Sequence, residues 1–254
     1  MEKTTNMKNT YFLLGPDDHG RSKKVEHFKN GQKVKTYNLD GSISLMSTIK
    51  KLKLSDNIMV IDKGFQIKVN KDVVKHLTLF NMIACADSSK KSLTIAQQIC
   101  EQIPFKKIIN HPKNVLKTTR QSISTLGHLK NIIMPQTATI KAQSQQELLN
   151  EILKQPIEFP LIIRIPHYHG GKYMKLLSAP SDLIDMDDWF SLSTSFNITE
   201  YFNVQDDKGY YHKARFAVVG GKVLPRHIIY SKQWCVHSEN RKVEMINNQS
   251  LKNL

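Results

Sequence analysis

The chain has 254 residues, 40% of them hydrophobic, so it is long enough to bury one large core or two smaller ones. Its 37 Lys and Arg residues outnumber the 22 Asp and Glu residues, which gives a formal net charge of +15 with neutral histidines. No apolar run approaches the roughly 18 residues of a membrane span, and Tyr11–Leu14 is too short for a signal-peptide core, so we expect a cytoplasmic protein.

Apolar runs alternate with helical patterns over the first half of the chain. Strands are expected at residues 11–14, 58–61, 82–85 and 105–109, and helices at residues 43–52 and 93–103. This alternation predicts an α/β layer with a largely parallel sheet. The segment Gly15-Pro16-Asp17-Asp18 after the first strand is a turn of the type that borders ligand crevices. It lacks the Gly-x-Gly-x-x-Gly pattern, so dinucleotide binding is not expected there.

A domain boundary is expected at residue 110. Pro112 suits the first turn of a helix that runs to about Leu129, with Asn110 or His111 near its N-cap. The division gives an α/β domain over residues 1–110 and a second region over residues 111–254.

The second region is expected to contain both helices and strands. Ser144 is predicted to cap a helix, Ser181 to cap an acidic first turn, and Gly220-Gly221 to form the turn of a β-hairpin. The expected strands are 137–140, 161–165, 196–202, 215–219 and 222–228, and the expected helices are 145–154 and a segment leading to 188–190.

The most informative stretch runs from Pro160 to Lys172. Arg164 lies in an apolar strand, where a guanidinium is costly unless it pairs with an anion. The Gly170-Gly171 loop that follows can bring backbone N–H groups close to phosphates, so the two features suggest a phosphate cradle. The alternative is an edge-strand Arg with an ion-pair partner beside an ordinary loop. His167 and His169 have no third ligand nearby in sequence, so they are read as loop histidines, or one of them as a phosphate contact.

A second constellation lies between residues 199 and 227. The period of two along the strand after residue 211 places Lys213 and Arg215 on one face. Ala214, Phe216 and Val218 then lie on the other face, which predicts one cationic face and one core face. The alternative is an exposed sheet face without a ligand.

Taken together, the blocks over residues 105–240 resemble the ATP-grasp superfamily, the fold of many carboxylate–amine ligases. The resemblance rests on four segments whose order and spacing agree with the family: Asn110–Arg120, Pro160–Lys172, Glu200–Phe202 and Tyr211–His237. It implies an α/β fold class: a pre-ATP-grasp-like α/β domain followed by an ATP-grasp-like α+β region.

The resemblance also implies roles for particular residues. It assigns phosphate contacts to one set, the adenine and ribose hinge to a second, and contacts with the anionic part of the substrate to a third. The three sets are Arg164, His169, Gly170, Gly171 and Lys172; Glu200, Tyr201 and Phe202; and Lys213 and Arg215.

The sequence departs from the family at its C-terminal end. ATP-grasp enzymes continue with an acidic strand and a Glu-x-Asn element, which bind the Mg²⁺ ions that bridge the phosphates. Glu239-Asn240 and Glu244–Asn247 do not have that spacing. The region is therefore read as C-terminally shortened and no metal ligand is assigned. Mg²⁺ is expected only if a longer chain or another subunit completes the site.

The leading functional hypothesis is an ATP-binding protein from a lineage of carboxylate–amine ligases that act through an acyl phosphate, with unknown carboxylate and amine substrates. The competing class is a non-catalytic nucleotide-binding or interaction module. A nucleic-acid-binding protein is the weaker alternative, because the basic doublets lack interleaved aromatic residues. Cys85, Cys100 and Cys235 are widely spaced and are expected to be free thiols.

Overall fold

The structure is a computed structural model that describes residues 8–18, 22–29, 32–39, 43, 45–61, 70–168, 170–237 and 245. Residues 22–29, 32–39, 47 and 71 are described by their backbone only. The chain divides into two compact units, Met1–Met134 and Pro135–Leu254. None of the described helices is both long and apolar enough to cross a membrane.

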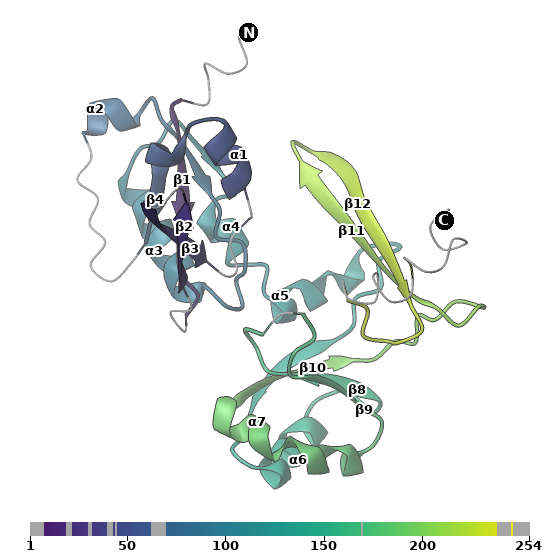
Figure 1. Cartoon of the computed structure of the whole chain (residues 1–254). Coiled ribbons are helices and arrows are strands. Elements are labelled where there is room, and N and C mark those ends of the chain that lie inside the picture. Colours follow the sequence, from purple (N-terminus) through teal and green to yellow (C-terminus); the bar gives the residue numbers. More distant parts are fainter. Residues whose placement is uncertain are drawn as a thin grey trace. The chain divides into compact units, whose positions relative to one another are not determined.

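The first unit is built on a parallel four-stranded sheet in the order β4-β1-β5-β6 (Figure 1). This confirms the expected α/β layer. The strands of the unit are β1 (Thr10–Leu14), β2 (Ser22–Lys29), β3 (Gln32–Leu39), β4 (Ile58–Val60), β5 (Thr78–Asn81) and β6 (Lys107–Ile109), of which β2 and β3 form a separate hairpin. The helices are α1 (Met46–Lys51), α2 (Lys71–Val74), α3 (Lys90–Gln102), α4 (Pro112–Val115) and α5 (Arg120–Ser124), with 3₁₀ turns η2 (Ser55–Asn57) and η3 (Thr125–His128).

Strand β1 is buried on both faces, which explains its continuous apolar run. Leu13 packs in a cluster with Leu93 of α3, whereas Phe12 and Leu14 pack in another cluster with Ile49 of α1. Alternate side chains of a strand point to opposite faces, so a central strand of this kind has no polar face.

Two expected elements of the first unit were placed wrongly. The third strand is β5, not residues 82–85: β5 ends at Asn81, whose side chain bonds the backbone of Ile83 in both directions, and Met82 and Ile83 are buried outside the strand. The single helix expected from Pro112 is broken into α4, α5 and η3. Thr119 accepts a hydrogen bond from the Ser122 N–H and starts α5 anew.

The segment after residue 110 is tied to the first unit. Arg120 Nη1 pairs with Asp87 Oδ2 at 2.5 Å, and α4 packs beside α3. These contacts place the division of the chain between residues 134 and 135, later than the expected boundary at residue 110.

The N-terminus of α3 is closed by a carboxylate that lies far away in the sequence. The Asp18 carboxylate accepts hydrogen bonds from the backbone N–H groups of Lys90, at 3.1 Å, and Lys91, at 2.8 Å. The first N–H groups of a helix otherwise attract phosphates. Asp18 therefore occupies the anion-binding position at the N-terminus of α3.

Replacing Asp18 with Ala is expected to lower the stability of α3 by about 1 kcal/mol, the usual value of an N-cap. Hydrogen–deuterium exchange of the α3 amides measures this loss without interference from the second unit. Asp56→Ala, at an exposed position in η2, is the matched control and should leave α3 protection unchanged. Equal effects of the two substitutions would contradict the capping role.

The second unit contains an antiparallel sheet in the order β7-β10-β8-β9, with α6 and α7 on one face (Figure 1). Its strands are β7 (Thr137–Lys141), β8 (Leu161–Arg164), β9 (Met174–Leu177), β10 (Ser195–Glu200), β11 (Tyr211–Val219) and β12 (Lys222–Ser231); its helices are α6 (Gln145–Leu153), α7 (Asp187–Leu192) and the 3₁₀ segment η4 (Pro180–Met186). An α/β unit followed by this α+β arrangement confirms the expected fold class.

Of the two helix caps predicted in the second unit, one is confirmed and one is wrong. Ser144 caps α6 as expected, accepting a hydrogen bond from the Glu147 N–H. Ser181 is not a cap: Ala179 begins η4, and Asp182 accepts the N–H groups of Ser178 and Ala179.

The hairpin β11–β12 forms around Gly220-Gly221 as expected, but its predicted core face is exposed. Phe216 is 57% and Val218 71% exposed. Among the described residues β11 and β12 pair only with each other, and their register shifts between Arg215 and Phe216. The prediction of a buried face here was therefore wrong.

Candidate functional site

The face of the second sheet opposite the helices carries polar side chains. Along β8, Leu161 and Ile163 enter the core, so Arg164 lies toward the other face. Its cross-strand neighbour is Asn197 of β10, which is buried and accepts a hydrogen bond from Thr139 at 2.9 Å. The strand register thus places the Arg164 guanidinium beside the Asn197 amide, on the face of the sheet that points away from the core.

A glycine loop follows Arg164 and returns to β9. The Ile165 N–H donates to the Tyr173 carbonyl at 3.0 Å and closes the base of the loop. Arg164 Nη2 donates to the carbonyl of Tyr168, which ties the guanidinium to the loop. Gly170 and Gly171 have φ of 71° and 77°, in the region that favours glycine. Backbone N–H groups in such a conformation can form an anion-binding concavity.

The lysine of this loop lies over two tyrosine rings. The Lys172 ammonium lies 5.0 Å from the centre of the Tyr173 ring and 5.6 Å from that of Tyr168. It is exposed, so a change of rotamer would release it from these cation–π contacts. His169, which was assigned with it, lies outside the described residues.

The segment after β12 packs directly against the glycine loop. A Cβ on Gly171 would come within 2.2 Å of His237 Nε2 and 3.1 Å of Cys235 Sγ. Lys213 Nζ, from β11, donates to the Val236 carbonyl at 3.2 Å, so its ammonium lies beside the segment that contacts Gly171. We call this group the cradle: Arg164, Gly170, Gly171, Lys213, Cys235 and His237.

The electrostatics of the cradle support this grouping. Burial raises the pKa of the Cys235 thiol, and the positive charges of Lys213 and Arg164 oppose that rise. Both cations must lie close to the thiol to act on it. The structure therefore brings together the stretch from Arg164 to Gly171, Lys213 of β11, and Cys235 with His237 after β12.

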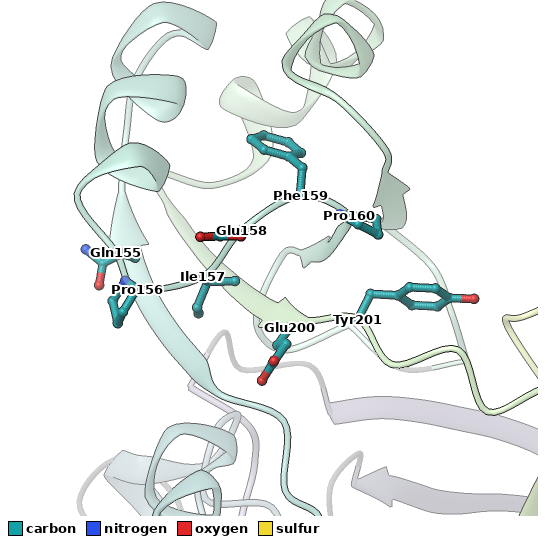
Figure 2. A pocket seen from close by; sticks show the side chains of 8 residues that line it. All are labelled: Gln155, Pro156, Ile157, Glu158, Phe159, Pro160, Glu200 and Tyr201. Atoms are coloured by element: carbon teal, nitrogen blue, oxygen red, sulfur yellow. The ribbon is translucent and has the colours of Figure 1, made fainter.

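A pocket of about 420 Å³ opens at the other end of β8 and β10 (Figure 2). It is lined by the loop before β8 and by two of the expected hinge residues: Gln155, Pro156, Ile157, Glu158, Phe159, Pro160, Glu200 and Tyr201. Figure 2 shows the side chains of Glu158 and Glu200 among them, so two carboxylates line the pocket together with the Gln155 amide and the Tyr201 hydroxyl.

The hinge residues are held in place by neighbours within the second unit. Glu200 accepts a hydrogen bond from the Gln136 N–H at 3.2 Å. The Tyr201 hydroxyl lies 3.0 Å from that of Tyr211, and burial together with this hydrogen bond raises the pKa of Tyr201 to about 12. Tyr201 is thus a neutral hydroxyl at physiological pH. Phe202 is 40% exposed and is not among the lining residues.

The register of β8 and β10 sets the distance between pocket and cradle. Glu200 pairs with Leu161, and Asn197 pairs with Arg164. Three residues of antiparallel strand span about 10 Å. An elongated ligand that combines an uncharged ring system with a polyanionic end fits this separation.

Some of these residues were not found by sequence reasoning. Cys235 and His237 were not among the predicted site residues, because they lie in an irregular segment after β12 where no strand or helix spacing rule applies. Arg215, which was expected to contact substrate, is exposed and pairs across the hairpin with His227.

No group of three or more His, Cys, Asp or Glu side chains in the described part of the chain is arranged to hold a metal ion. Asp206 serves the turn before β11, accepting from the N–H groups of Tyr210 and Lys208 and contacting His212. Glu239 and Glu244 lie outside the described residues. The described residues therefore do not fit a magnesium site.

No family model matches the sequence, and no curated protein matches it. Several solved structures are similar to the chain at low sequence identity. A carboxyaminoimidazole ribonucleotide synthase from Aspergillus clavatus complexed with ATP has a TM-score of 0.48 and 10% identity, over 89% of this chain and 55% of that one. The D-alanyl-alanine synthetase A from Vibrio cholerae has a TM-score of 0.46 and 9% identity, over 95% and 73%.

A RimK domain protein from Sphaerobacter thermophilus, described as ATP-grasp, has a TM-score of 0.41 and 8% identity, over 86% of this chain and 72% of that one. The chain spans about half the length of the Aspergillus clavatus structure.

Proposed function

We propose that the second unit binds ATP, with adenosine in the pocket and the phosphates in the cradle. The observation that carries this proposal is the arrangement along one strand pair. The pocket lies at one end of β8 and β10, and Arg164 with the glycine loop lies at the other, about 10 Å away. The cations lie at the cradle end, where they suit the phosphates of a nucleotide. The carboxylates lie at the pocket end, where they suit the hydroxyl and amino donors of its adenosine.

Each group in the proposed site has a task that its chemistry suits. The Glu200 carboxylate can accept hydrogen bonds from ribose hydroxyls, and Tyr201 offers an aromatic surface beside it. Arg164 can donate two hydrogen bonds to one phosphate because its guanidinium is planar. Lys213 adds a second positive charge, and Lys172 a third once its side chain leaves the tyrosine rings.

We further propose that the chain comes from a lineage of ATP-dependent carboxylate–amine ligases, with a carboxylate and an amine as substrates. ATP would supply the phosphoryl group of an acyl phosphate in such a reaction. The residues of this chain would bind and orient the nucleotide. No metal ligand is assigned among the described residues, so nucleotide binding is the function proposed for the chain itself.

ATP is expected to raise the melting temperature of the second unit. A ligand that binds only the folded state adds RT ln(1 + [L]/Kd), about 2.7 kcal/mol at a hundredfold excess over Kd. Tryptophan fluorescence reports this unit alone, because Trp189 and Trp234 are the two tryptophans of the chain and both lie in it. Adenosine and pyrophosphate, tested separately, should each give a smaller shift. No shift with millimolar ATP or ADP, with or without Mg²⁺, would contradict the proposal.

Replacing Arg164 with Gln is expected to weaken ATP binding about 10- to 150-fold. A hydrogen bond to a charged group is worth roughly 1.5 to 3 kcal/mol where water is excluded. Lys154→Gln is the control, since Lys154 is exposed on α6 in a surface ion pair with Glu151. Titration calorimetry measures both, and equal affinities of the two variants would remove Arg164 from the site.

A further inference from the structure

The cradle contains a nucleophile that nucleotide binding does not use. Cys235 Sγ lies 3.0 Å from His237 Nε2, and both side chains are partly accessible. Gly171 lies against this pair so closely that even a methyl group would collide with it. The thiol, the imidazole and the glycine loop thus form one contact surface.

The charges around this thiol are positive. Lys213 Nζ donates a hydrogen bond to the carbonyl of Val236, the residue between Cys235 and His237. The positive charge of Arg164, in β8, opposes the rise in the pKa of the Cys235 thiol. Burial still raises the pKa of the Cys235 thiol despite these charges, so its reaction with electrophiles depends on the adjacent imidazole, which can take the proton as the sulfur attacks. The same positive charges attract reagents that carry negative charge.

We infer that Cys235 is a site of covalent modification by anionic disulfides of the glutathione disulfide class, and that the resulting adduct closes the cradle to phosphates. The second half of this inference rests on the proposed nucleotide site. An adduct on Cys235 would lie against Gly171 and bring its own carboxylates to the cations that the phosphates would otherwise contact.

The step is a thiol–disulfide exchange in which no outside oxidant besides the disulfide is needed. His237 Nε2 takes the thiol proton as Cys235 Sγ attacks one sulfur of the disulfide. A new S–S bond forms to Cys235, the old S–S bond breaks, and one glutathione leaves as a thiolate that is then protonated. Cys235 is oxidised and one half of the reagent is reduced.

Cys100 of α3 is an internal comparison in the same chain. It is also partly accessible, but burial and the negative charge of Glu101 raise the pKa of its thiol to about 11. Anionic disulfides are repelled there and attracted at Cys235. The contrast between the two thiols depends on the sign of the local charge.

The experiment exposes the full chain to glutathione disulfide, which is doubly anionic, or to cystamine, which is doubly cationic. Peptide mass spectrometry measures the adduct on each cysteine with time. We expect the ratio of the glutathione disulfide rate to the cystamine rate to be about tenfold higher at Cys235 than at Cys100 at low salt, and to narrow as salt is added. Lys213→Gln should lower the ratio at Cys235 and leave that at Cys100 unchanged.

The charge preference is a comparison of reaction rates at two cysteines in one sample. It can therefore still be measured in a variant that is partly destabilised. His237→Asn is expected to slow both reagents at Cys235 alike, because it removes the proton acceptor without changing the charge. A Cys235 that reacts no faster than Cys100, or without preference for the anionic reagent, would overturn the inference.

Nucleotide separates this inference from the proposed function. ATP should protect Cys235 but not Cys100, and the wild-type adduct, unlike disulfide-treated Cys235→Ser, should show no melting shift with ATP. If ATP gives no shift in the untreated protein while Cys235 keeps its preference, the nucleotide site is wrong and the modification site stands. If ATP binds but neither protects Cys235 nor is blocked by the adduct, closure of the cradle is wrong.

Discussion

Gly171→Ala is expected to destabilise the second unit by about 2 to 5 kcal/mol and to abolish nucleotide binding. Two effects add. An alanine at φ of +77° costs about 1 to 2 kcal/mol, and its Cβ would come within 2.2 Å of His237 Nε2, an overlap of the kind that costs a further 1 to 3 kcal/mol. Relief of the overlap must displace the His237 imidazole from its place beside Gly171 and Cys235.

Gly170→Ala provides the matched control for this prediction. Gly170 has nearly the same φ, +71°, but no atom lies within 4 Å of the Cβ that alanine would add. It should therefore lose only the 1 to 2 kcal/mol of backbone strain. Urea unfolding followed by tryptophan fluorescence compares the two, and titration calorimetry gives their ATP affinities. Equal losses would mean that the contact between loop and tail does not shape the site.

Local signals in the sequence predicted local structure well. Ser144 before an amphipathic run and Gly220-Gly221 between β-rich runs each specify their geometry within a few residues. The prediction at residues 82–85 was wrong because a short apolar segment is compatible with a strand and with a buried irregular segment. What distinguishes them is the Asn81 side chain folding back on the chain, which is a tertiary detail.

The strand and the glycine loop of the candidate site could be predicted from the sequence. The contact between that loop and the segment after β12 could not. Arg164 and the two glycines stand close together in sequence, so a cation beside a flexible loop could be inferred directly. The contact of Gly171 with Cys235 and His237 joins positions more than sixty residues apart, and no spacing rule connects them. The prediction of a core face at Phe216 and Val218 was wrong for a different reason. Alternation predicts that the two side chains share a face of the strand, but it does not predict that another layer covers that face.

Phe196→Ala is expected to lower the free energy of unfolding of the second unit by about 3 to 5 kcal/mol, a large part of the stability of an ordinary domain. Phe196 is fully buried in β10, and its ring packs edge-on against that of Phe190 at 5.5 Å. Truncation leaves a cavity under the central strand, which connects the pocket at Glu200 with the cradle at Asn197 and Arg164.

Phe216→Ala is the control, because it removes the same side chain from a position in the same unit that is 57% exposed. Loss of a largely exposed ring forfeits little buried area, so the change should stay within about 1 kcal/mol. Tryptophan fluorescence in urea measures both variants. A loss at Phe216 as large as that at Phe196 would mean that the hairpin face is covered in solution. Comparable small losses at both would mean that β10 does not form the centre of the core that holds the two halves of the site in register.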